Sequence, residues 1–356
     1  MDRILISRMR AGKIPVLVLL FVCTVFLLTT GCNLTRPCRD DFVGVGEGVI
    51  TMTTSSLYVE IAIGPINNIV IDWGDGAKST MSANPTWHNL IQFKHTYEND
   101  LPRTITIFGD ITYLQSFDGN LTNLDISRNP LLEGLVIYAP ITDLYLDNNT
   151  VLQFLLIYDN QLIDLDISNN TMLHSIFLRG TQLTNLDLRN NIMLESLSVF
   201  ESSLTSLDVG YNVILESLRI GGLPLTNLEL SKNTMLRSLT VSDTPLTNLN
   251  VANNVMLEAL EINGFPLTNI DLSKNAVLQF LSIQDNQLTN LNLSNNKNLR
   301  LVNIRNNLFL PNALDDLFRT LHDIPVQKEI RIGNNPGTDE CDIGIATAKG
   351  WSVGVW

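Results

Sequence analysis

The feature that most constrains this chain is a repeat of 21 residues. Nine consecutive segments begin with a leucine or isoleucine, from Leu121 to Leu288, and their starts lie 21 residues apart after a first step of 20. One segment of this length cannot bury its apolar face alone, whereas stacked segments build a continuous apolar core. The period therefore predicts a solenoid whose length comes from added coils and not from added domains.

Each coil contains two apolar units of the form L-x-x-L-x-L. The leucine-rich-repeat pattern L-x-x-L-x-L-x-x-N-x-L is met in full by Leu278, Leu281, Ile283, Asn286 and Leu288. Over about residues 111 to 356 the chain resembles bacterial leucine-rich-repeat lipoproteins and, more loosely, internalins. The resemblance implies a mostly β solenoid of the α/β leucine-rich-repeat type, but it says nothing about the ligand.

One half of each coil is nearly constant and carries one asparagine per coil. A side-chain amide has two donors and one acceptor, so stacked asparagines can pair the inward backbone groups of a turn that has no sheet partner. We therefore expect a structural ladder of Asn129, Asn149, Asn170, Asn191, Asn212, Asn233, Asn254, Asn275 and Asn296.

An outward column beside this ladder is mostly acidic. It consists of Asp125, Tyr145, Asp166, Asp187, Asp208, Glu229, Asn250, Asp271 and Asn292. Carboxylates in a row are candidate Ca²⁺ ligands, but the threonine and asparagine neighbours favour a solvated face. We therefore expect no metal site here.

The other half of each coil keeps only its apolar skeleton, and its outward residues change from coil to coil. Large apolar patches on a protein surface mark interaction sites, and Tyr and Arg are frequent at binding hot spots. The first four coils predict an exposed ligand-binding surface made of Val136, Tyr138, Leu156, Tyr158, Phe177, Arg179 and Phe200. The alternatives are packing of this patch on the preceding domain and plain strand propensity. Both halves fit the strand unit, and the family pattern favours this half for the concave sheet.

Residues 45 to 110 predict a small all-β domain. Runs of β-branched and aromatic residues separated by turn residues occur at 50–54, 57–63, 68–73, 91–97 and 103–109. The segment Asp72-Trp73-Gly74-Asp75-Gly76 and the later Phe93-Lys94-His95-Thr96-Tyr97 resemble the polycystic-kidney-disease-type (PKD-like) β-sandwich. The resemblance implies a spacer or binding module. His95, Asp72 and Asp75 are alternatively a metal or acid–base cluster, but turn and corner chemistry accounts for them.

The first 31 residues predict a secretory signal. Basic residues precede an apolar run from Ile14 to Leu28, and small residues follow. The junction Thr29-Thr30-Gly31-Cys32 resembles a bacterial lipobox, which implies that Cys32 is acylated and that residues 32–44 form a tether. Asn33 lacks the charge of the aspartate that holds such lipoproteins at an inner membrane, so we expect an outer-membrane location with cell-surface exposure. An ordinary signal peptide and an uncleaved anchor are the alternatives.

The repeat decays after residue 308. Apolar residues recur at helical spacing over 312–324 and again over 340–350, while 329–337 and 351–356 favour strands. Atypical ends cover the exposed core of a solenoid. We therefore expect five regions, namely a signal (1–31), a tether (32–44), a PKD-like sandwich (45–110), leucine-rich repeats (111–308) and an α/β C-terminal cap (309–356).

Charge and motifs exclude several functions. The formal net charge is -13, and removal of the signal leaves 19 basic and 35 acidic residues, so we expect no nucleic-acid partner. No nucleophile elbow, zinc-protease motif, phosphate loop or dinucleotide fingerprint occurs, so we expect neither an enzyme nor a cofactor.

The sequence favours a monomeric, lipid-anchored envelope protein that touches the membrane only through its N-terminal lipid. Its repeat surface is expected to bind a protein, peptide or glycan, as in adhesion or host interaction. The alternatives are an envelope scaffold without a specific ligand and an accessory subunit of a glycan-degrading system.

Overall fold

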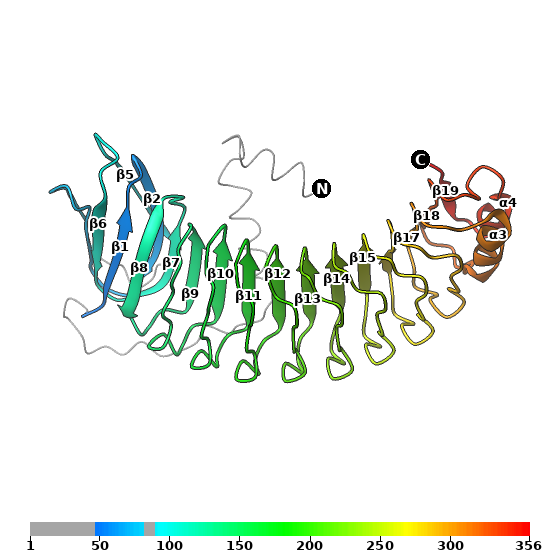
Figure 1. The fold of residues 1–356 in the computed structure, drawn as a ribbon, viewed down its shortest axis with the longest axis horizontal. Coiled ribbons are helices and arrows are strands. Elements are labelled where there is room, and N and C mark those ends of the chain that lie inside the picture. The colour runs from blue at the N-terminus through cyan, green and yellow to red at the C-terminus, as the bar shows by residue number, and fades with distance from the viewer. Residues whose placement is uncertain (1–46, 82–89) are drawn as a thin grey trace. The chain divides into compact units, whose positions relative to one another are not determined.

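The computed structural model describes residues 47–81 and 90–356, which belong to one compact unit, Val45–Trp356 (Figure 1). The expected signal peptide, Cys32 and tether lie outside the described residues. Within the described part of the chain, no helix is long and apolar enough to cross a membrane.

The N-terminal part of the unit is a small all-β domain. Its strands are β1 (Val49–Thr54), β2 (Tyr58–Pro65), β3 (Ile69–Asp72), β4 (Lys78–Met81), β5 (Ile91–Thr96), β6 (Arg103–Phe108), β7 (Ile111–Ser116) and β8 (Leu121–Arg128). One sheet has the order β4-β3-β6-β1-β8, and the second contains β7-β2-β5. Alternate residues point inward, so Ile50, Met52, Ile61 and Ile63 are fully buried in one core.

Strand β7 joins this domain to the solenoid. It pairs antiparallel with β2 and parallel with β9 (Gly134–Tyr138), so a single sheet of 14 strands runs from β5 to the C-terminal strand. Strand β8 belongs to the first predicted coil, yet it pairs antiparallel with β1. Strand pairing therefore continues across the expected domain boundary at residue 110. The sandwich covers the apolar end of the solenoid.

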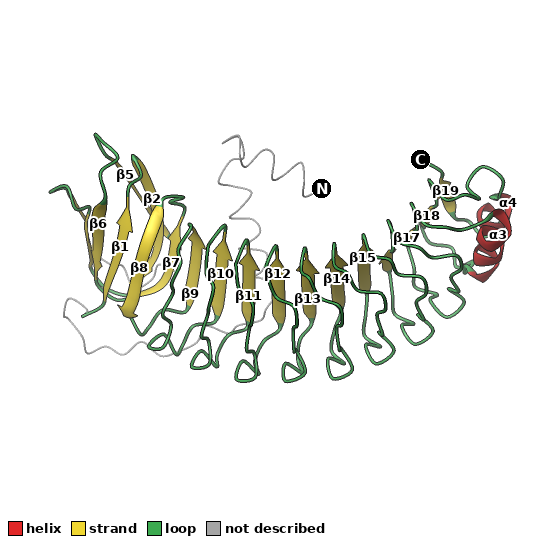
Figure 2. Cartoon of the chain, viewed as in Figure 1, coloured by secondary structure: helices red, strands yellow, loops and turns green. Residues whose placement is uncertain are grey.

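Each later coil contributes one parallel strand, and it comes from the variable half. These strands are β10 (Phe154–Tyr158), β11 (Ser175–Arg179), β12 (Ser196–Phe200), β13 (Ser217–Gly221), β14 (Ser238–Ser242), β15 (Ala259–Asn263), β16 (Phe280–Ser282) and β17 (Leu301–Asn303). The constant half forms turns and extended segments without strand pairing from residue 141 onward (Figure 2). Each coil therefore has one sheet-forming half, although the spacing fits both.

The asparagines of the constant half are fully buried and tie each coil to the one before it. The amide nitrogen Nδ2 of Asn170 donates to the carbonyl oxygens of Leu146 at 3.0 Å and Asn149 at 2.8 Å. The same two bonds recur in every coil through Asn296, which bonds to Leu272 and Asn275. The ladder satisfies carbonyl groups that no strand partner reaches.

The C-terminal part covers the other end of the core. It contains α3 (Pro311–Thr320), β18 (Glu329–Arg331), α4 (Gly344–Thr347) and β19 (Ser352–Gly354), which are shorter than the sequence pattern suggests. Phe309, Phe318 and Trp351 are buried against the last coils. The ammonium of Lys349 donates to the carbonyls of Phe318, Arg319 and Leu321 at the end of α3, where cations offset the helix dipole.

Candidate binding surface on the parallel sheet

The residues of the predicted patch come together on the outward face of β9 to β12. Strand register places Tyr138, Tyr158, Arg179 and Phe200 side by side in one column. A second column holds Val136, Leu156, Phe177 and Ser198. Parallel in-register strands repeat each position at about 4.8 Å, so equivalent side chains of neighbouring coils are in contact distance.

Five rings form one continuous stack on this face, which we call the aromatic stack. Its members, in order, are Phe117, Tyr138, Tyr158, Phe177 and Phe200. Successive ring centroids lie 5.6, 4.3, 4.5 and 5.8 Å apart. The sequence prediction missed Phe117, because this residue precedes the first full repeat and has no equivalent to align with.

Phe177 enters the stack from the other column. Register pairs Tyr158 with Arg179, but the ring of Phe177 occupies the space between Tyr158 and Phe200. Arg179 instead makes a two-bond ion pair with Glu201, with nitrogen–oxygen distances of 2.8 and 3.3 Å. The guanidinium of Arg179 is therefore already paired beside the stack.

Glycine ends the stack on its C-terminal side. A Cβ atom at Gly221 would lie 2.9 Å from Cδ1 of Phe200 and 2.6 Å from Oγ of Ser242. The ring of Phe200 thus lies against a strand position that has no side chain. The aromatic character of the face stops at β13, whose outward positions are Arg219 and Gly221.

Val136 departs from the expectation of an exposed patch. Its side chain is only 1 % exposed, so its prediction as an exposed contact residue is wrong. Val136 lies between Gln115 and Leu156 on the neighbouring strands. A short side chain flanked by longer ones on both sides is covered by them. Leu156, Tyr138, Tyr158, Phe177, Arg179 and Phe200 are each partly exposed.

The C-terminal half of the sheet face is polar. Nδ2 of Asn303 donates to Oε1 of Gln284 at 2.9 Å and to Oγ of Ser282 at 3.3 Å. Nε of Arg305 donates to Oδ1 of Asn303 at 3.2 Å. This network fixes amide side chains across β16 and β17, and the face changes from aromatic to amide-rich along its length.

A second feature of the face is invisible in the sequence pattern. The residue directly after each of β10 to β15 has a positive φ, and acidic residues alternate with glycine in this column along the sheet. We call the acidic members the acidic rim: Asp159 (φ 49°), Glu201 (φ 52°), Asp243 (φ 49°) and Asp285 (φ 57°). The intervening residues are Gly180, Gly222 and Gly264. A positive φ suits glycine, asparagine and aspartate, which explains much of this column.

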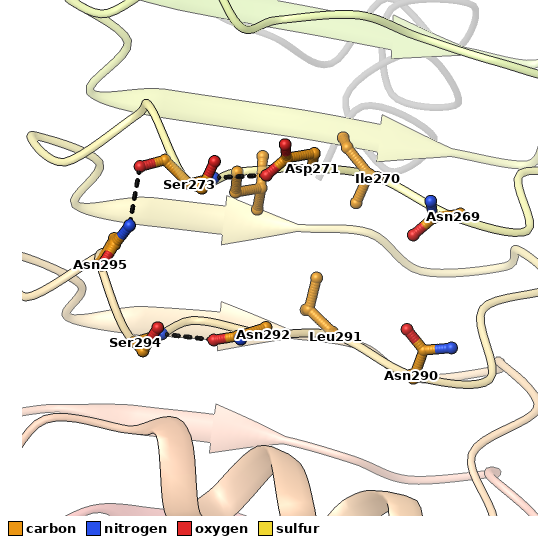
Figure 3. Close-up of a pocket in the computed structure, with 10 residues that line it drawn as sticks. Asn269, Ile270, Asp271, Ser273, Asn290, Leu291, Asn292, Ser294 and Asn295 are labelled. Atoms are coloured by element: carbon orange, nitrogen blue, oxygen red, sulfur yellow. Dashed lines mark hydrogen bonds between the residues drawn. The ribbon is translucent and has the colours of Figure 1, made fainter.

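The acidic column of the constant half has a structural use. Each polar member accepts the backbone N–H two residues later, as Asp166 does from Ser168 at 2.9 Å and Asn292 from Ser294 at 3.0 Å. Figure 3 shows this arrangement in a shallow pocket between two coils, where the carboxylate of Asp271 turns back on Ser273. Within residues 47–81 and 90–356, no group of three or more His, Cys, Asp and Glu residues is placed to hold a metal ion.

These hydrogen bonds within the turns also lower the pKa values of the acidic side chains. A side-chain hydrogen bond from Arg189, with a second from its backbone, lowers the pKa of Asp187 to about 2. Side-chain and backbone bonds from Ser168 lower the pKa of Asp166 in the same way. Asp166 and Asp187 are therefore ionised at neutral pH and stabilise their turns in that state.

The histidine of the sandwich lies in a turn and corner cluster. Nε2 of His95 is 2.7 Å from Oδ2 of Asp75, and its ring stacks on Trp73 with centroids 4.8 Å apart. The hydroxyl of Tyr97 donates to the carbonyl of Trp73 at 2.7 Å. The carboxylate of Asp72 faces Lys78 at 3.3 Å instead of His95, so the three predicted groups do not converge.

Comparison with known proteins bears on the fold. No protein-family model matches the chain, and no curated protein is similar to it. Among solved structures it is similar to the functional domain of InlJ from Listeria monocytogenes, which includes a cysteine ladder, at 25 % identity with a TM-score of 0.60. That match covers 68 % of this chain and 53 % of the InlJ chain, so it spans about half the length of that protein.

A second Listeria monocytogenes internalin, InlF, matches at 23 % identity with a TM-score of 0.51, covering 63 % of this chain and 74 % of that chain. The predicted mostly β leucine-rich-repeat solenoid with 21-residue coils is confirmed. The resemblance to internalins holds for the repeats, whereas the PKD-like nature of the sandwich remains a prediction.

Proposed function

We propose that this chain is a protein-binding module, and that the aromatic stack on the outward face of β9 to β12 is the centre of its binding surface. The observation that carries the proposal is the placement of five rings on one side of a sheet whose opposite side is the fully buried leucine core. Large amphipathic side chains on a rigid sheet are typical anchors of protein interfaces.

The geometry favours a protein or peptide over a glycan. A sugar packs its flat face on the face of an aromatic ring, but in this stack the ring faces are directed at one another, with interplanar angles of 9° and 29° at Tyr158. The ring edges are what the surface presents. Edges carry the positive part of the ring quadrupole, so they suit carbonyl oxygens and aliphatic groups of a polypeptide.

A photo-crosslinking experiment tests this function. Benzoylphenylalanine at position 158 in cells that make the protein should give discrete protein adducts. The matched control is the same residue at position 211, since Tyr211 is exposed on the constant half of its coil. Phe177→Ala with Phe200→Ala should remove the adducts at 158. Because the loss of these rings also destabilises the solenoid, circular dichroism of the variant must show that it is still folded.

A structural scaffold is the second candidate, and one observation favours it. The rings contact each other over four successive coils, so the stack also stabilises the solenoid without any partner. Under that alternative, position 158 gives no more adducts than position 211.

We propose further that the module is held at the cell envelope by a lipid on Cys32. The support is the Thr29-Thr30-Gly31-Cys32 junction after an apolar run. Labelling with an alkyne fatty acid should mark the chain and should fail for Cys32→Ser. Protease treatment of intact cells then tests surface exposure, because a protein behind a membrane is protected.

A further inference from the structure

Glycine alternates with acidic residues in the column of the acidic rim because of the positive φ and, at Gly264, also for a steric reason. A Cβ atom at Gly264 would lie 2.9 Å from Oδ1 of Asp243, so the aspartate side chain extends over the glycine of the next coil. Gly180 lies in the same way beside Asp159, with its Cβ position 3.7 Å from the carboxylate oxygen. The positive φ favours glycine at all three positions, and at Gly264 glycine also leaves room for the carboxylate of Asp243.

The rim borders the same face as the aromatic stack. Asp159 follows Tyr158 directly in sequence, and Glu201 follows Phe200. The ion pair between Glu201 and Arg179 shows that a rim carboxylate reaches the side chains of the sheet face. A ligand on the stack thus lies within reach of Asp159 and Glu201, and an extended ligand that continues along the sheet face also reaches Asp243.

The opposite border of the face is mixed in charge, with both glutamates and basic residues. Glu195, Glu216 and Glu258 stand just before β12, β13 and β15. Arg237 lies between two of them, 3.8 Å from Glu216 and 2.8 Å from Glu258. Arg179 is paired with Glu201, and Arg219 is an exposed cation on β13. The acidic rim is therefore the border with the more regular negative charge, whereas Arg237 neutralises part of the opposite border.

The rim has a regular spacing that constrains an extended ligand. Backbone bonds continue through this column, as from Asp159 N to Arg179 O at 3.0 Å and from Glu201 N to Gly221 O at 2.9 Å. Adjacent hydrogen-bonded strands are about 4.8 Å apart, so acids on alternate coils recur at roughly 9.6 Å. A polyproline II helix rises about 3.1 Å per residue with three residues per turn, or roughly 9.3 Å per turn.

On the basis of the proposed function, we infer that the partner is an extended, proline-rich protein segment with a lysine or arginine at about every third residue. Its basic side chains meet the acidic rim, and its apolar side lies on the aromatic stack. Polyproline II segments have no internal hydrogen bonds, so their carbonyl groups are available to ring edges. Aromatic surfaces are an established way to bind such helices.

Fluorescence anisotropy with synthetic probes tests this inference on the purified full-length chain in a mild detergent. The probe is a labelled peptide of five Pro-Pro-Lys repeats. One comparison peptide carries Glu in place of Lys, and a second has the same composition with its five lysines grouped at one end. The regularly spaced lysine peptide should bind most tightly, and its affinity should fall with added salt.

A matched pair of variants locates the contact. Asp159→Asn with Asp243→Asn removes two rim charges, and asparagine already occupies this column at positive φ in Asn306 and Asn334. The affinity for the Pro-Pro-Lys peptide should fall about threefold to tenfold, as two exposed ion pairs imply. The control, Asp143→Asn with Asp147→Asn, changes two acids of the constant half and should have no effect.

Two outcomes overturn the inference. Equal binding of the lysine and glutamate peptides removes the charge argument, and equal binding of the spaced and grouped lysines removes the polyproline geometry. If these preferences are absent but crosslinking at position 158 persists, the proposed protein-binding function holds and the partner has a different chemistry. If the peptide preference and the crosslinks are both absent, the inference and the proposed function are both wrong.

Discussion

Tyr158 and Phe177 stack with their ring centroids 4.5 Å apart, although they stand in different columns of the parallel sheet. Strand pairing alone would set Arg179 against Tyr158. The ring of Phe177 occupies this place because its contacts with two aromatic neighbours stabilise the folded chain more than an exposed cation would. The guanidinium of Arg179 instead forms an ion pair with Glu201.

Removing the ring of Phe177 should therefore destabilise the solenoid. Phe177→Ala loses two ring contacts, each worth about 0.5–1.5 kcal/mol beyond the buried area, so we expect a loss of about 2 kcal/mol in the free energy of unfolding. Urea unfolding followed by circular dichroism measures it. Arg179→Ala, which removes only a partly exposed ion pair, should cost less than about 1 kcal/mol, and equal costs for the two variants contradict the stack's stabilising role.

Substitution of a ladder asparagine should lower the free energy of unfolding far more than substitution of the exposed asparagine next to it. Asn191 donates to Ile167 O and Asn170 O, both at 3.0 Å and both buried. Asn191→Ala leaves two buried carbonyls unpaired, so we expect a loss of about 2–4 kcal/mol in the free energy of unfolding. Asn190→Ala loses one exposed bond to Ser168 O and should cost less than about 1 kcal/mol. Thermal unfolding of the two variants gives the comparison, and similar melting temperatures would count against the ladder.

Acid should weaken the turns of the constant half. The folded pKa of Asp187 is lowered to about 2 from an ordinary value of 3.8, so its contribution is complete above pH 4 and is lost as the pH falls toward 2. Asp187→Asn keeps an acceptor for the turn, as Asn250 does for Ala252 at 3.0 Å, but it removes the titration. Melting temperatures between pH 5 and pH 2 should fall more steeply for the wild-type chain than for this variant, and parallel curves contradict the assignment.

The C-terminal cap should depend on Lys349. Its ammonium bonds to the carbonyls of Phe318 at 3.2 Å and Leu321 at 2.7 Å, at the C-terminal end of α3. Lys349→Met keeps the aliphatic stem and removes the donors, so we expect a loss of about 1–3 kcal/mol. Hydrogen exchange of α3 should increase, whereas Lys297→Met on an exposed turn should leave it unchanged. Unchanged exchange in both variants means that the cap is held by its apolar contacts.

Much of the fold follows from the sequence because stacking dictates it. The 21-residue period fixes the inward leucines, and Asn149 to Asn296 recur because each faces the same unpaired carbonyl groups, whereas Asn129 bonds to Gly109 and Ile111 of the sandwich side. The six accessible members of the predicted patch, such as Tyr138 and Phe200, also lie where strand alternation puts them.

The remaining features depend on neighbours that the period does not specify. Val136 is covered by adjacent strands, and Phe117 joins the stack from outside the repeat. The acidic rim depends on positive φ at residues such as Asp159, and the leucine pattern does not encode that backbone angle. The role of β7 depends on pairing between two differently built regions.

The double pairing of β7 bears on how the chain acquires its structure. Because Leu114 is held by Ile63 on one side and by Leu135 on the other, the sandwich offers a ready template for the first parallel strand. Although a repeat array can begin to fold at any coil, we expect later coils to add most readily to this edge. An array that loses its last coils then keeps a start site, whereas one that loses the sandwich does not.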